Sequence, residues 1–224
     1  MAQAMVSVVI PTMNEEKSIG LVIDEVVKAL GSSWPFEIVV VDTDSKDRTR
    51  EIASQTGARV IEEPRRGYGR AYKTGFENSQ GDIIVTLDAD MTYPAEKIPS
   101  LIEMLEIKGL DFITTNRFAS MEKGAMSFKH KFGNWVLSTT ARILFRVRLK
   151  DSQSGMWVFR KAVLGSLDVK SDGMSFSEEL KIEAFRKSKA AEVPITYRVR
   201  VGEVKLSSWK DGTGNLKYLF KKRF

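Results

Sequence analysis

Two aspartates stand one residue apart where an apolar stretch of the chain ends. Residues 82–90 read Asp-Ile-Ile-Val-Thr-Leu-Asp-Ala-Asp, and the apolar, β-branched run indicates a buried strand. Alternate residues of an extended segment share a face, so Asp88 and Asp90 would point the same way. Mg²⁺ and Mn²⁺ are usually held by one or two carboxylates together with substrate phosphates. The pair therefore predicts a metal–diphosphate site at the end of a central strand, although an isolated Asp-x-Asp is also common in solvated turns.

A third acidic residue, Asp42, ends another apolar run at residues 36–41. Ligands of open α/β sheets bind outside the carboxyl ends of the strands. Asp42 would thus accept hydrogen bonds from a base or a ribose, unless it is only a turn or helix-capping aspartate. The turn Gly67-Tyr68-Gly69 would let backbone N–H groups approach an anion, or it is a plain loop. The sequence holds no GxGxxG, GxxxxGKS or GxxxxGKT motif, which weakens the case for a dinucleotide oxidoreductase or a P-loop ATPase.

Strands and helices alternate along the chain. Apolar strands are predicted at 6–10, 36–41, 59–61 and 83–87, with helices between them. The first helix is expected to begin with Asn14 as its N-cap and to end at Gly31. Further helices are expected near 94–109, 135–149 and 178–187, and further strands near 112–116, 156–159 and 193–201. This alternation predicts an α/β fold with a mostly parallel, doubly wound sheet and helices on both faces.

The composition restricts the partners of the protein. Among 224 residues there is no cysteine and one histidine, His130, which excludes disulfides, thiolate chemistry and a multi-histidine metal site. The formal net charge of +6 favours anionic partners such as phosphates, nucleic acid or an acidic membrane surface. No run approaches the ~20 apolar residues of a spanning helix, and the N-terminus lacks the layout of a signal peptide. We therefore expect a cytoplasmic protein whose membrane contact is peripheral.

Several separated segments together resemble a known family. The chain looks like the GT-A glycosyltransferases of family 2 in Val9-Ile10-Pro11-Thr12-Met13-Asn14-Glu15, in Val40-Val41-Asp42 with Ser45-Lys46-Asp47-Arg48-Thr49, and in Gly81-Asp82 leading to Asp88-Ala89-Asp90. Residues 5–206 are more narrowly similar to the catalytic domain of dolichyl-phosphate mannose synthases, through Asn116-Arg117-Phe118, Asp151-Ser152-Gln153-Ser154-Gly155, and Val193-Pro194-Ile195-Thr196-Tyr197 with Arg200, Gly202, Glu203 and Lys205. The resemblance implies a GT-A catalytic domain at residues 1–206, followed by a basic and aromatic tail at 207–224.

The resemblance also implies roles for single residues. A nucleotide would be bound by Pro11, Met13, Glu15, Asp42, Asp44, Asp88 and Ala89. Mg²⁺ or Mn²⁺ would be held by Asp88, Asp90 and Thr92. The catalytic groups, which include the diphosphate and acceptor-phosphate contacts, would be Asp90, Arg117, Arg200 and Lys205. The chain departs from the family pattern at Met13, where tyrosine is frequent, at Thr43, where a second aspartate is frequent, and at Thr92, where glutamine is frequent.

The implied reaction moves a hexose to a polyprenyl (dolichyl) phosphate at the cytoplasmic face of a membrane. The second pKa of a phosphate monoester is about 6, so the acceptor is ionised near pH 7 and needs no strong general base. Cations must instead hold two anionic substrates together, and in-line displacement would invert the anomeric carbon. GDP-mannose is the first expectation for the donor, and UDP-glucose or another UDP-hexose is the alternative.

Three competing interpretations stay open from the sequence. The acceptor could be a soluble phosphorylated molecule, or the chain could bind a nucleotide sugar without catalysis. A basic nucleic-acid-binding module is the third, but the sequence shows no recognition motif for it, and we expect no nucleic-acid partner.

A lipid acceptor would account for a basic, apolar region in the second half of the chain. The predicted helix 135–149 is amphipathic, and residues 219–224 combine aromatic with basic side chains. Such segments are typical of interfacial anchors, and we expect Arg142, Arg146 and Ser154 on the acceptor or membrane side. The alternative is a helix packed on the sheet with a solvated basic rim. Related enzymes often continue into transmembrane helices that these 224 residues lack, so we expect peripheral binding or a separate membrane-anchoring subunit.

Overall fold

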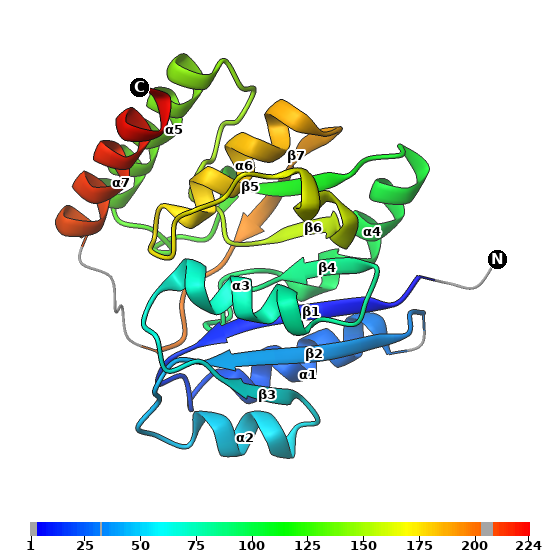
Figure 1. The fold of residues 1–224 in the computed structure, drawn as a ribbon. Helices are drawn as coiled ribbons and strands as arrows, with labels where there is room; N and C mark the ends of the chain where they lie inside the picture. Colours follow the sequence, from blue (N-terminus) through cyan, green and yellow to red (C-terminus); the bar gives the residue numbers. More distant parts are fainter. Residues whose placement is uncertain (1–3, 32, 203–207) are drawn as a thin grey trace.

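A seven-stranded sheet crosses the molecule (Figure 1), which a computed structural model describes over residues 4–31, 33–202 and 208–224. The strands are β1 (Val6–Thr12), β2 (Phe36–Asp42), β3 (Arg59–Glu62), β4 (Ile83–Thr86), β5 (Phe112–Met121), β6 (Trp157–Arg160) and β7 (Ala190–Tyr197). Their order is β3-β2-β1-β4-β6-β5-β7. β3, β2, β1 and β4 pair in parallel, as do β5 and β7, while β6 is antiparallel to both its neighbours. The prediction of a mostly parallel sheet is confirmed.

Helices cover both faces of the sheet, as predicted (Figure 1). One face packs against α1 (Ile19–Leu30), α2 (Thr49–Gln55), the 3₁₀ turn η1 (Ala95–Lys97) and α4 (Ile98–Ile107). The other packs against α3 (Tyr68–Asn78), the 3₁₀ segment η2 (Lys161–Ser166) and α6 (Phe176–Lys187). Successive strand residues alternate faces, so Val8 enters the first core and Val9 the second. Both faces of these strands are buried, which explains why the strand sequences are continuous apolar runs.

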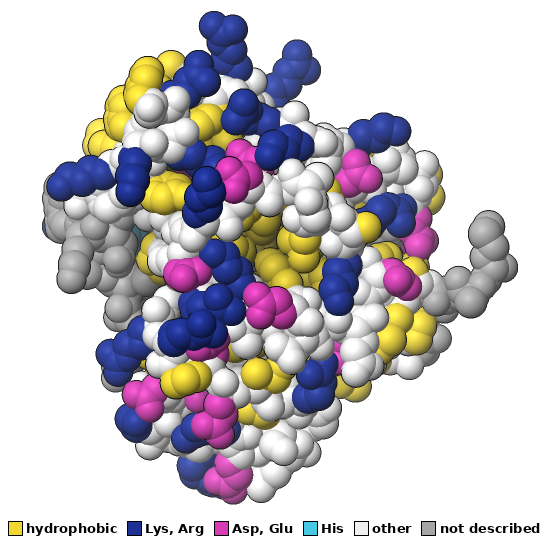
Figure 2. Space-filling model, viewed as in Figure 1, with side chains coloured by type: hydrophobic (Ala, Val, Ile, Leu, Met, Phe, Trp, Pro, Cys, Tyr) yellow, Lys and Arg dark blue, Asp and Glu magenta, His cyan; other side chains and the backbone are white. Residues whose placement is uncertain are grey.

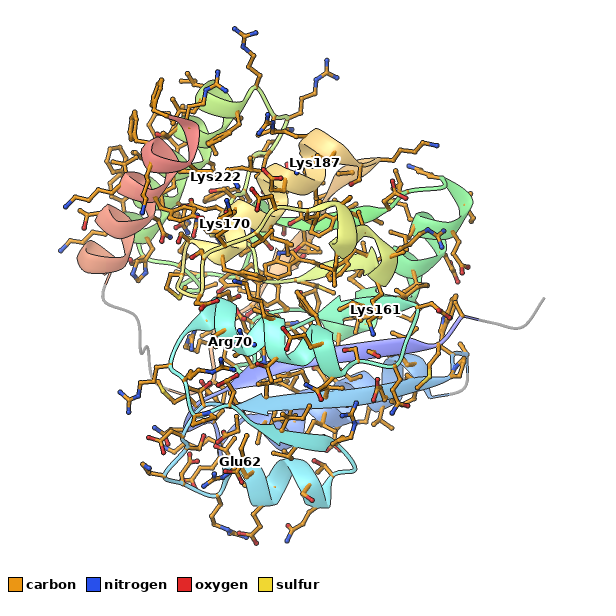
Figure 3. The ribbon with its side chains drawn as sticks, viewed as in Figure 1. Glu62, Arg70, Lys161, Lys170, Lys187 and Lys222 are labelled. Carbon is orange, nitrogen blue, oxygen red and sulfur yellow. The ribbon has the colours of Figure 1, made fainter. Side chains whose placement is uncertain are left out.

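Two further helices, α5 (Phe128–Phe145) and α7 (Ser208–Arg223), lie side by side at one end of the sheet (Figure 1). Their contact with α6 is an apolar cluster of Leu137, Ala141, Phe145, Val147, Leu149, Ile182 and Leu219. Figure 3 shows Lys222 of α7 reaching α6, where its Nζ lies 2.9 Å from Glu179 and 3.3 Å from Glu183. The described part of the C-terminal tail is therefore a packed helix. The division of the chain after residue 206 stays a prediction.

Two helices begin elsewhere than the sequence pattern suggests. α1 begins at Ile19, because Asn14 takes a left-handed conformation (φ 55°) and its side-chain oxygen accepts a hydrogen bond from the Lys46 N–H at 2.7 Å. α5 begins at Phe128, because the Ser127 hydroxyl caps it by accepting from the His130 N–H. It ends at the left-handed Arg146 (φ 56°), short of the predicted residue 149.

Candidate active site

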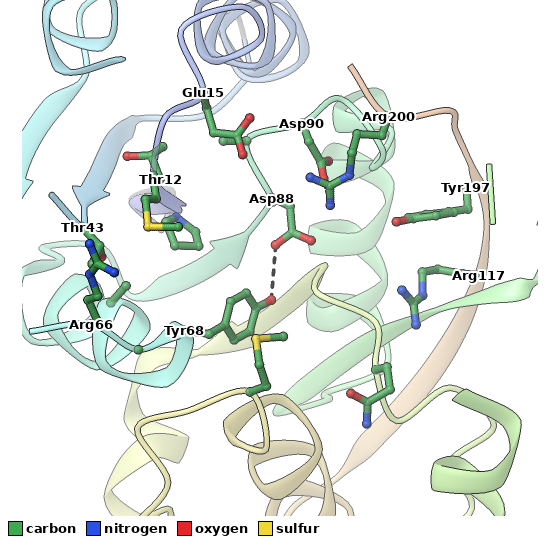
Figure 4. A pocket seen from close by; sticks show the side chains of 17 residues that line it. Thr12, Glu15, Thr43, Arg66, Tyr68, Asp88, Asp90, Arg117, Tyr197 and Arg200 are labelled. Carbon is green, nitrogen blue, oxygen red and sulfur yellow. Dashed lines mark hydrogen bonds and ion pairs between the residues drawn. The ribbon is translucent and has the colours of Figure 1, made fainter. Parts of the chain in front are cut away.

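A cavity of about 370 Å³ opens at the carboxyl ends of β1, β2 and β4 (Figure 4). Eight residues for which the resemblance implied a nucleotide, metal or catalytic role line it: Pro11, Met13, Glu15, Asp88, Ala89, Asp90, Arg117 and Arg200. They come from segments far apart in the chain, from Pro11 to Arg200, and meet in one cleft. Asp88, Asp90, Arg117 and Arg200 thus share one cleft at this edge of the sheet, whereas Asp42 does not line it.

The two central aspartates sit just beyond β4 with different partners. The Oδ1 atom of Asp90 accepts hydrogen bonds from the Thr92 N–H at 3.1 Å and from the Thr92 hydroxyl at 2.5 Å. Its Oδ2 atom forms an ion pair at 2.6 Å with Nη2 of Arg200. Asp88 accepts a hydrogen bond from the Tyr68 hydroxyl at 3.3 Å (Figure 4). Arg200 thus offsets the charge of Asp90, while Asp88 has a neutral donor.

This carboxylate pair is electrostatically unfavourable as it stands. Burial and the nearby Asp90 charge raise the pKa of Asp88 to about 7, although Arg200 and Arg117 oppose the shift. The described residues hold no group of three or more His, Cys, Asp or Glu side chains that could enclose a metal. Two oxygen ligands with excess negative charge suit a cation that completes its coordination with substrate phosphates. The donor set therefore fits Mg²⁺ or Mn²⁺ bound together with a diphosphate.

Arg117, in the middle of β5, is held by a buried carboxylate. Its Nε and Nη2 atoms donate to the two oxygens of Asp151 at 2.8 and 2.9 Å, and its backbone N–H donates to the same group at 3.0 Å. The Tyr197 ring lies 5.3 Å from the guanidinium carbon. Both Arg117 and Asp151 are buried. This two-pronged pairing occupies Nε and Nη2 and fixes the plane of the guanidinium, so that phosphate oxygens would meet its remaining N–H groups.

The other end of the cleft is lined by Thr12, Met13, Thr43, Arg66 and Gly67. Asp42, expected to contact a base or ribose, does not line it, since its carboxylate accepts from the Thr12 hydroxyl and from the N–H and hydroxyl of Ser45. Asp44 does not line the cleft either, and it pairs with Lys46 and, at 3.6 Å, with Arg66. The nucleotide roles of Asp42 and Asp44 stay predictions.

Four other predicted site residues, Thr92, Arg142, Arg146 and Ser154, do not line the cleft. Ser154 is fully buried, and its hydroxyl is 2.7 Å from that of Thr115. Arg142 and Arg146 are exposed on α5 and at its end. Thr92 is buried with its hydroxyl on Asp90, so direct metal ligation would require that hydrogen bond to break. Lys205 lies outside the described residues. Their proposed roles as acceptor, membrane, metal and phosphate ligands stay predictions.

Gly67 and Tyr68 of the glycine turn line the cleft, and its anion-binding role stays a prediction. Other lining residues had no assigned role from the sequence, namely Arg66, Gln153, Met174 and Tyr197. Most of them lie on loops or at the ends of helices and strands. Local sequence patterns do not show how such segments are placed relative to one another. One signal was available in the glycine two residues after Gln153. A Cβ atom on Gly155 would lie 3.0 Å from both Asp88 carboxylate oxygens, so the segment 151–155 approaches the aspartates more closely than other residues allow.

Beside the cleft, a buried carboxyl group makes stability depend on pH. Glu178 on α6 is fully buried and accepts a hydrogen bond from Nε2 of Gln153 at 2.8 Å. Burial raises the pKa of Glu178 from 4.5 to about 8. Between these values the unfolded chain releases a proton that the folded protein keeps. The contribution of Glu178 to the free energy of unfolding therefore falls as pH rises through this window, by on the order of 1 kcal/mol per pH unit.

We predict that Glu178→Gln removes this dependence, because glutamine is neutral and keeps an acceptor for Gln153. Thermal unfolding of the variant should match wild type near pH 5 and show a higher Tm near pH 8.5. Glu103→Gln, on the exposed side of α4, is the matched control and should change the Tm little at either pH. An equal difference at both pH values would contradict a titrating Glu178.

Comparison with known proteins places the chain in a class. The model of the family described as glycosyl transferase family 2 matches residues 7–167, and the chain belongs to that family. This family membership agrees with the sequence resemblance. The fold is of the GT-A type. It superimposes on glucosyl-3-phosphoglycerate synthase from Mycobacterium tuberculosis, solved with Mn²⁺, UDP-glucose and phosphoglyceric acid. The TM-score is 0.79 at 22% identity, over 98% of this chain and 79% of that one.

Three curated relatives are similar over most of this chain. Low-salt glycan biosynthesis hexosyltransferase Agl6 from Haloferax volcanii is 38% identical over 95% of this chain and 52% of its own length. A dolichyl-phosphate hexose transferase from the same organism is 35% identical over 92% of this chain and 88% of its own length. Dolichol-phosphate mannosyltransferase from Pyrococcus furiosus is 34% identical over 90% of this chain and 59% of its own length. The chain thus spans little more than half the length of two of these relatives.

Along the residues that the structure describes, none of the helices is both long and apolar enough to cross a membrane.

Proposed function

We propose that this glycosyltransferase moves a hexose from a nucleoside diphosphate to a polyprenyl phosphate. One observation carries the proposal: Asp88, Asp90, Arg117 and Arg200 line a single cleft. The names of the relatives from Haloferax volcanii and Pyrococcus furiosus support this acceptor. GDP-mannose is our first expectation for the donor, with a UDP-hexose as the alternative.

The order of groups along the cleft gives the donor an orientation. Met13, Thr43 and Arg66 line the end near β1 and β2, where a base would lie. Arg200 and the two aspartates lie in the middle (Figure 4), where a diphosphate bound together with Mg²⁺ or Mn²⁺ would meet them. The metal, held by Asp88 and Asp90, would neutralise charge on the departing nucleoside diphosphate. The hexose would then extend toward Arg117 and Tyr197.

The residues around the acceptor need only hold and orient it. Its phosphate is ionised near pH 7, so no side chain has to remove a proton. Arg117, fixed by Asp151, would hold the phosphate oxygens against the hexose, and Arg200 would bridge the charge of the two substrates. Attack in line with the departing diphosphate inverts the anomeric carbon.

A membrane-facing surface would deliver the lipid acceptor. We define the α5 face as the exposed apolar side chains Phe128, Phe132, Trp135 and Ile143, which are 56–82% exposed. The Phe132 and Trp135 rings stack with centroids 6.0 Å apart. Figure 2 shows hydrophobic side chains gathered over α5 and the end of α7, with Lys and Arg nearby. Such a combination suits peripheral contact with an anionic leaflet, which we place at the cytoplasmic face of the membrane.

The test combines catalysis with membrane binding. Wild type should transfer labelled hexose to polyprenyl phosphate in anionic vesicles, with product of inverted anomeric configuration. We predict that the double variant Phe132→Ser with Trp135→Ser binds vesicles and transfers hexose roughly 10-fold or more weakly, because each apolar side chain contributes about 1–2 kcal/mol at the interface. Its affinity for the nucleotide sugar in solution should be unchanged.

Ile107→Ser is the matched control, because Ile107 is 85% exposed on α4, which packs on another part of the sheet. If wild type uses a soluble phosphorylated acceptor and ignores vesicles, the lipid proposal is wrong. If the control weakens vesicle binding as much as the double variant, the α5 face is not the contact surface.

A further inference from the structure

Gln153 lines the cleft beside Arg117, and its side-chain amide is held from two sides. Its backbone N–H donates to Oδ1 of Asp151 at 3.1 Å, the carboxylate that also holds Arg117. Its Nε2 atom donates to Glu178 at 2.8 Å and to the Ser152 hydroxyl at 3.1 Å. Its Oε1 atom accepts from Nδ2 of Asn215 at 3.3 Å. Both N–H bonds of the amide are therefore used within the protein.

The amide oxygen is the part of Gln153 left to meet a substrate. A carboxamide oxygen accepts two hydrogen bonds, and Asn215 supplies one of them. An oxygen acceptor would repel a phosphate anion but would pair with a hydroxyl group. In the assigned orientation Nε2 faces the Glu178 oxygen and the Ser152 hydroxyl, and Oε1 faces Nδ2 of Asn215.

Hydroxyl groups are what a hexose presents at this end of the cleft. We propose that Gln153 is a specificity-determining residue that accepts a hydrogen bond from a hydroxyl of the donor hexose, and that Asn215 of α7 positions it. The proposal rests on the proposed function, which places the hexose beyond the aspartates near Arg117. It assigns α7, which lies outside the matched family region 7–167, a part in substrate selection.

The anchoring of α7 supports a positioning role for Asn215. Asn215 is 6% exposed, and Leu219, one turn further along, is fully buried against α5 and α6. Lys222 then pairs with Glu179 and Glu183 of α6, the helix that also carries Glu178. The two amide partners of Gln153 are thus fixed relative to each other by one packed interface, so the amide oxygen keeps one direction.

A double-mutant cycle on the full chain tests the proposal. Gln153→Ala and Asn215→Ala should each weaken binding of the nucleotide sugar about 10-fold, measured by calorimetry, because each removes or misdirects one hydrogen bond. Binding of the nucleoside diphosphate alone should stay within about 2-fold of wild type, since it makes no contact there. The double variant should be no weaker than Gln153→Ala, because Asn215 acts only through Gln153. Lys217→Ala, exposed on the same helix, is the control.

Three results would overturn the assignment: sugar-nucleotide affinity unchanged in both single variants, equal losses for the nucleotide sugar and the nucleoside diphosphate, or additive losses in the double variant. Thermal unfolding of each variant shows whether it is folded. If Asn215→Ala is unfolded, Asn215→Ser takes its place, and because serine keeps a donor, its affinity for the nucleotide sugar should be partly recovered. Failure of wild type to glycosylate polyprenyl phosphate would overturn the proposed acceptor without changing these binding results.

Discussion

Replacing Asp90 by asparagine should lower the rate of hexose transfer about 10³-fold. The carboxamide oxygen of the new side chain could still accept from Thr92, so the local turn should survive. The variant loses the negative charge that pairs with Arg200 at 2.6 Å and that the proposed metal site requires. The affinity for Mn²⁺ in the presence of nucleoside diphosphate should fall with the rate, because both depend on the same carboxylate.

The matched control is Asp82→Asn, which alters an exposed aspartate at the opposite end of the same strand. The initial rate of this variant and its affinity for Mn²⁺, measured by titration, should be close to those of wild type. Turnover of Asp90→Asn within about 10-fold of wild type would show that the carboxylate pair does not hold the reacting diphosphate.

Replacing Arg117 by lysine should lower kcat/KM for the acceptor about 10²-fold while changing KM for the donor little. Lysine keeps the positive charge but cannot donate to both Asp151 oxygens and to a phosphate in one plane. The free energy of unfolding should also fall by about 2–3 kcal/mol, because the buried Asp151 carboxylate loses part of its pairing.

Arg59→Lys provides the comparison, since Arg59 pairs with Glu37 on the far edge of the sheet and is half-exposed. Its change in unfolding free energy should stay below about 1 kcal/mol, with normal acceptor kinetics. Rates are measured at a temperature where every variant is folded. Acceptor kinetics that are unchanged in Arg117→Lys would remove Arg117 from the acceptor site.

The sequence predicted those parts of the fold that depend on local patterns. Apolar runs at 36–41 and 83–87 identify β2 and β4, and the aspartates after them locate the cleft edge. The start of α5 was missed because residues 120–131 are basic and turn-like in sequence, while the Ser127 cap and the packing with α7 stabilise the helix there.

Site residues were harder to predict where their role depends on distant partners. The sequence does not show that Thr12 and Ser45 hydrogen-bond to the carboxylate of Asp42, and the nucleotide role of Asp42 stays a prediction. Gln153 is held in the cleft by Asp151 and by Asn215 of α7. Gln153 and Asn215 are 62 residues apart in the chain, so no local sequence pattern indicates their contact. Tertiary contact, rather than residue type, decided which polar groups face the cleft.

The central claim is that one cleft gathers the donor diphosphate and the acceptor phosphate around the same cationic centre. Phosphorus-31 relaxation tests it directly in wild type mixed with Mn²⁺, a nucleoside diphosphate and a phosphonate analogue of the polyprenyl acceptor. We predict strong relaxation of the phosphorus signals of both molecules, lost for both in Asp90→Asn. An acceptor signal that Mn²⁺ leaves unaffected while the diphosphate relaxes would place the two substrates at separate sites and contradict the account.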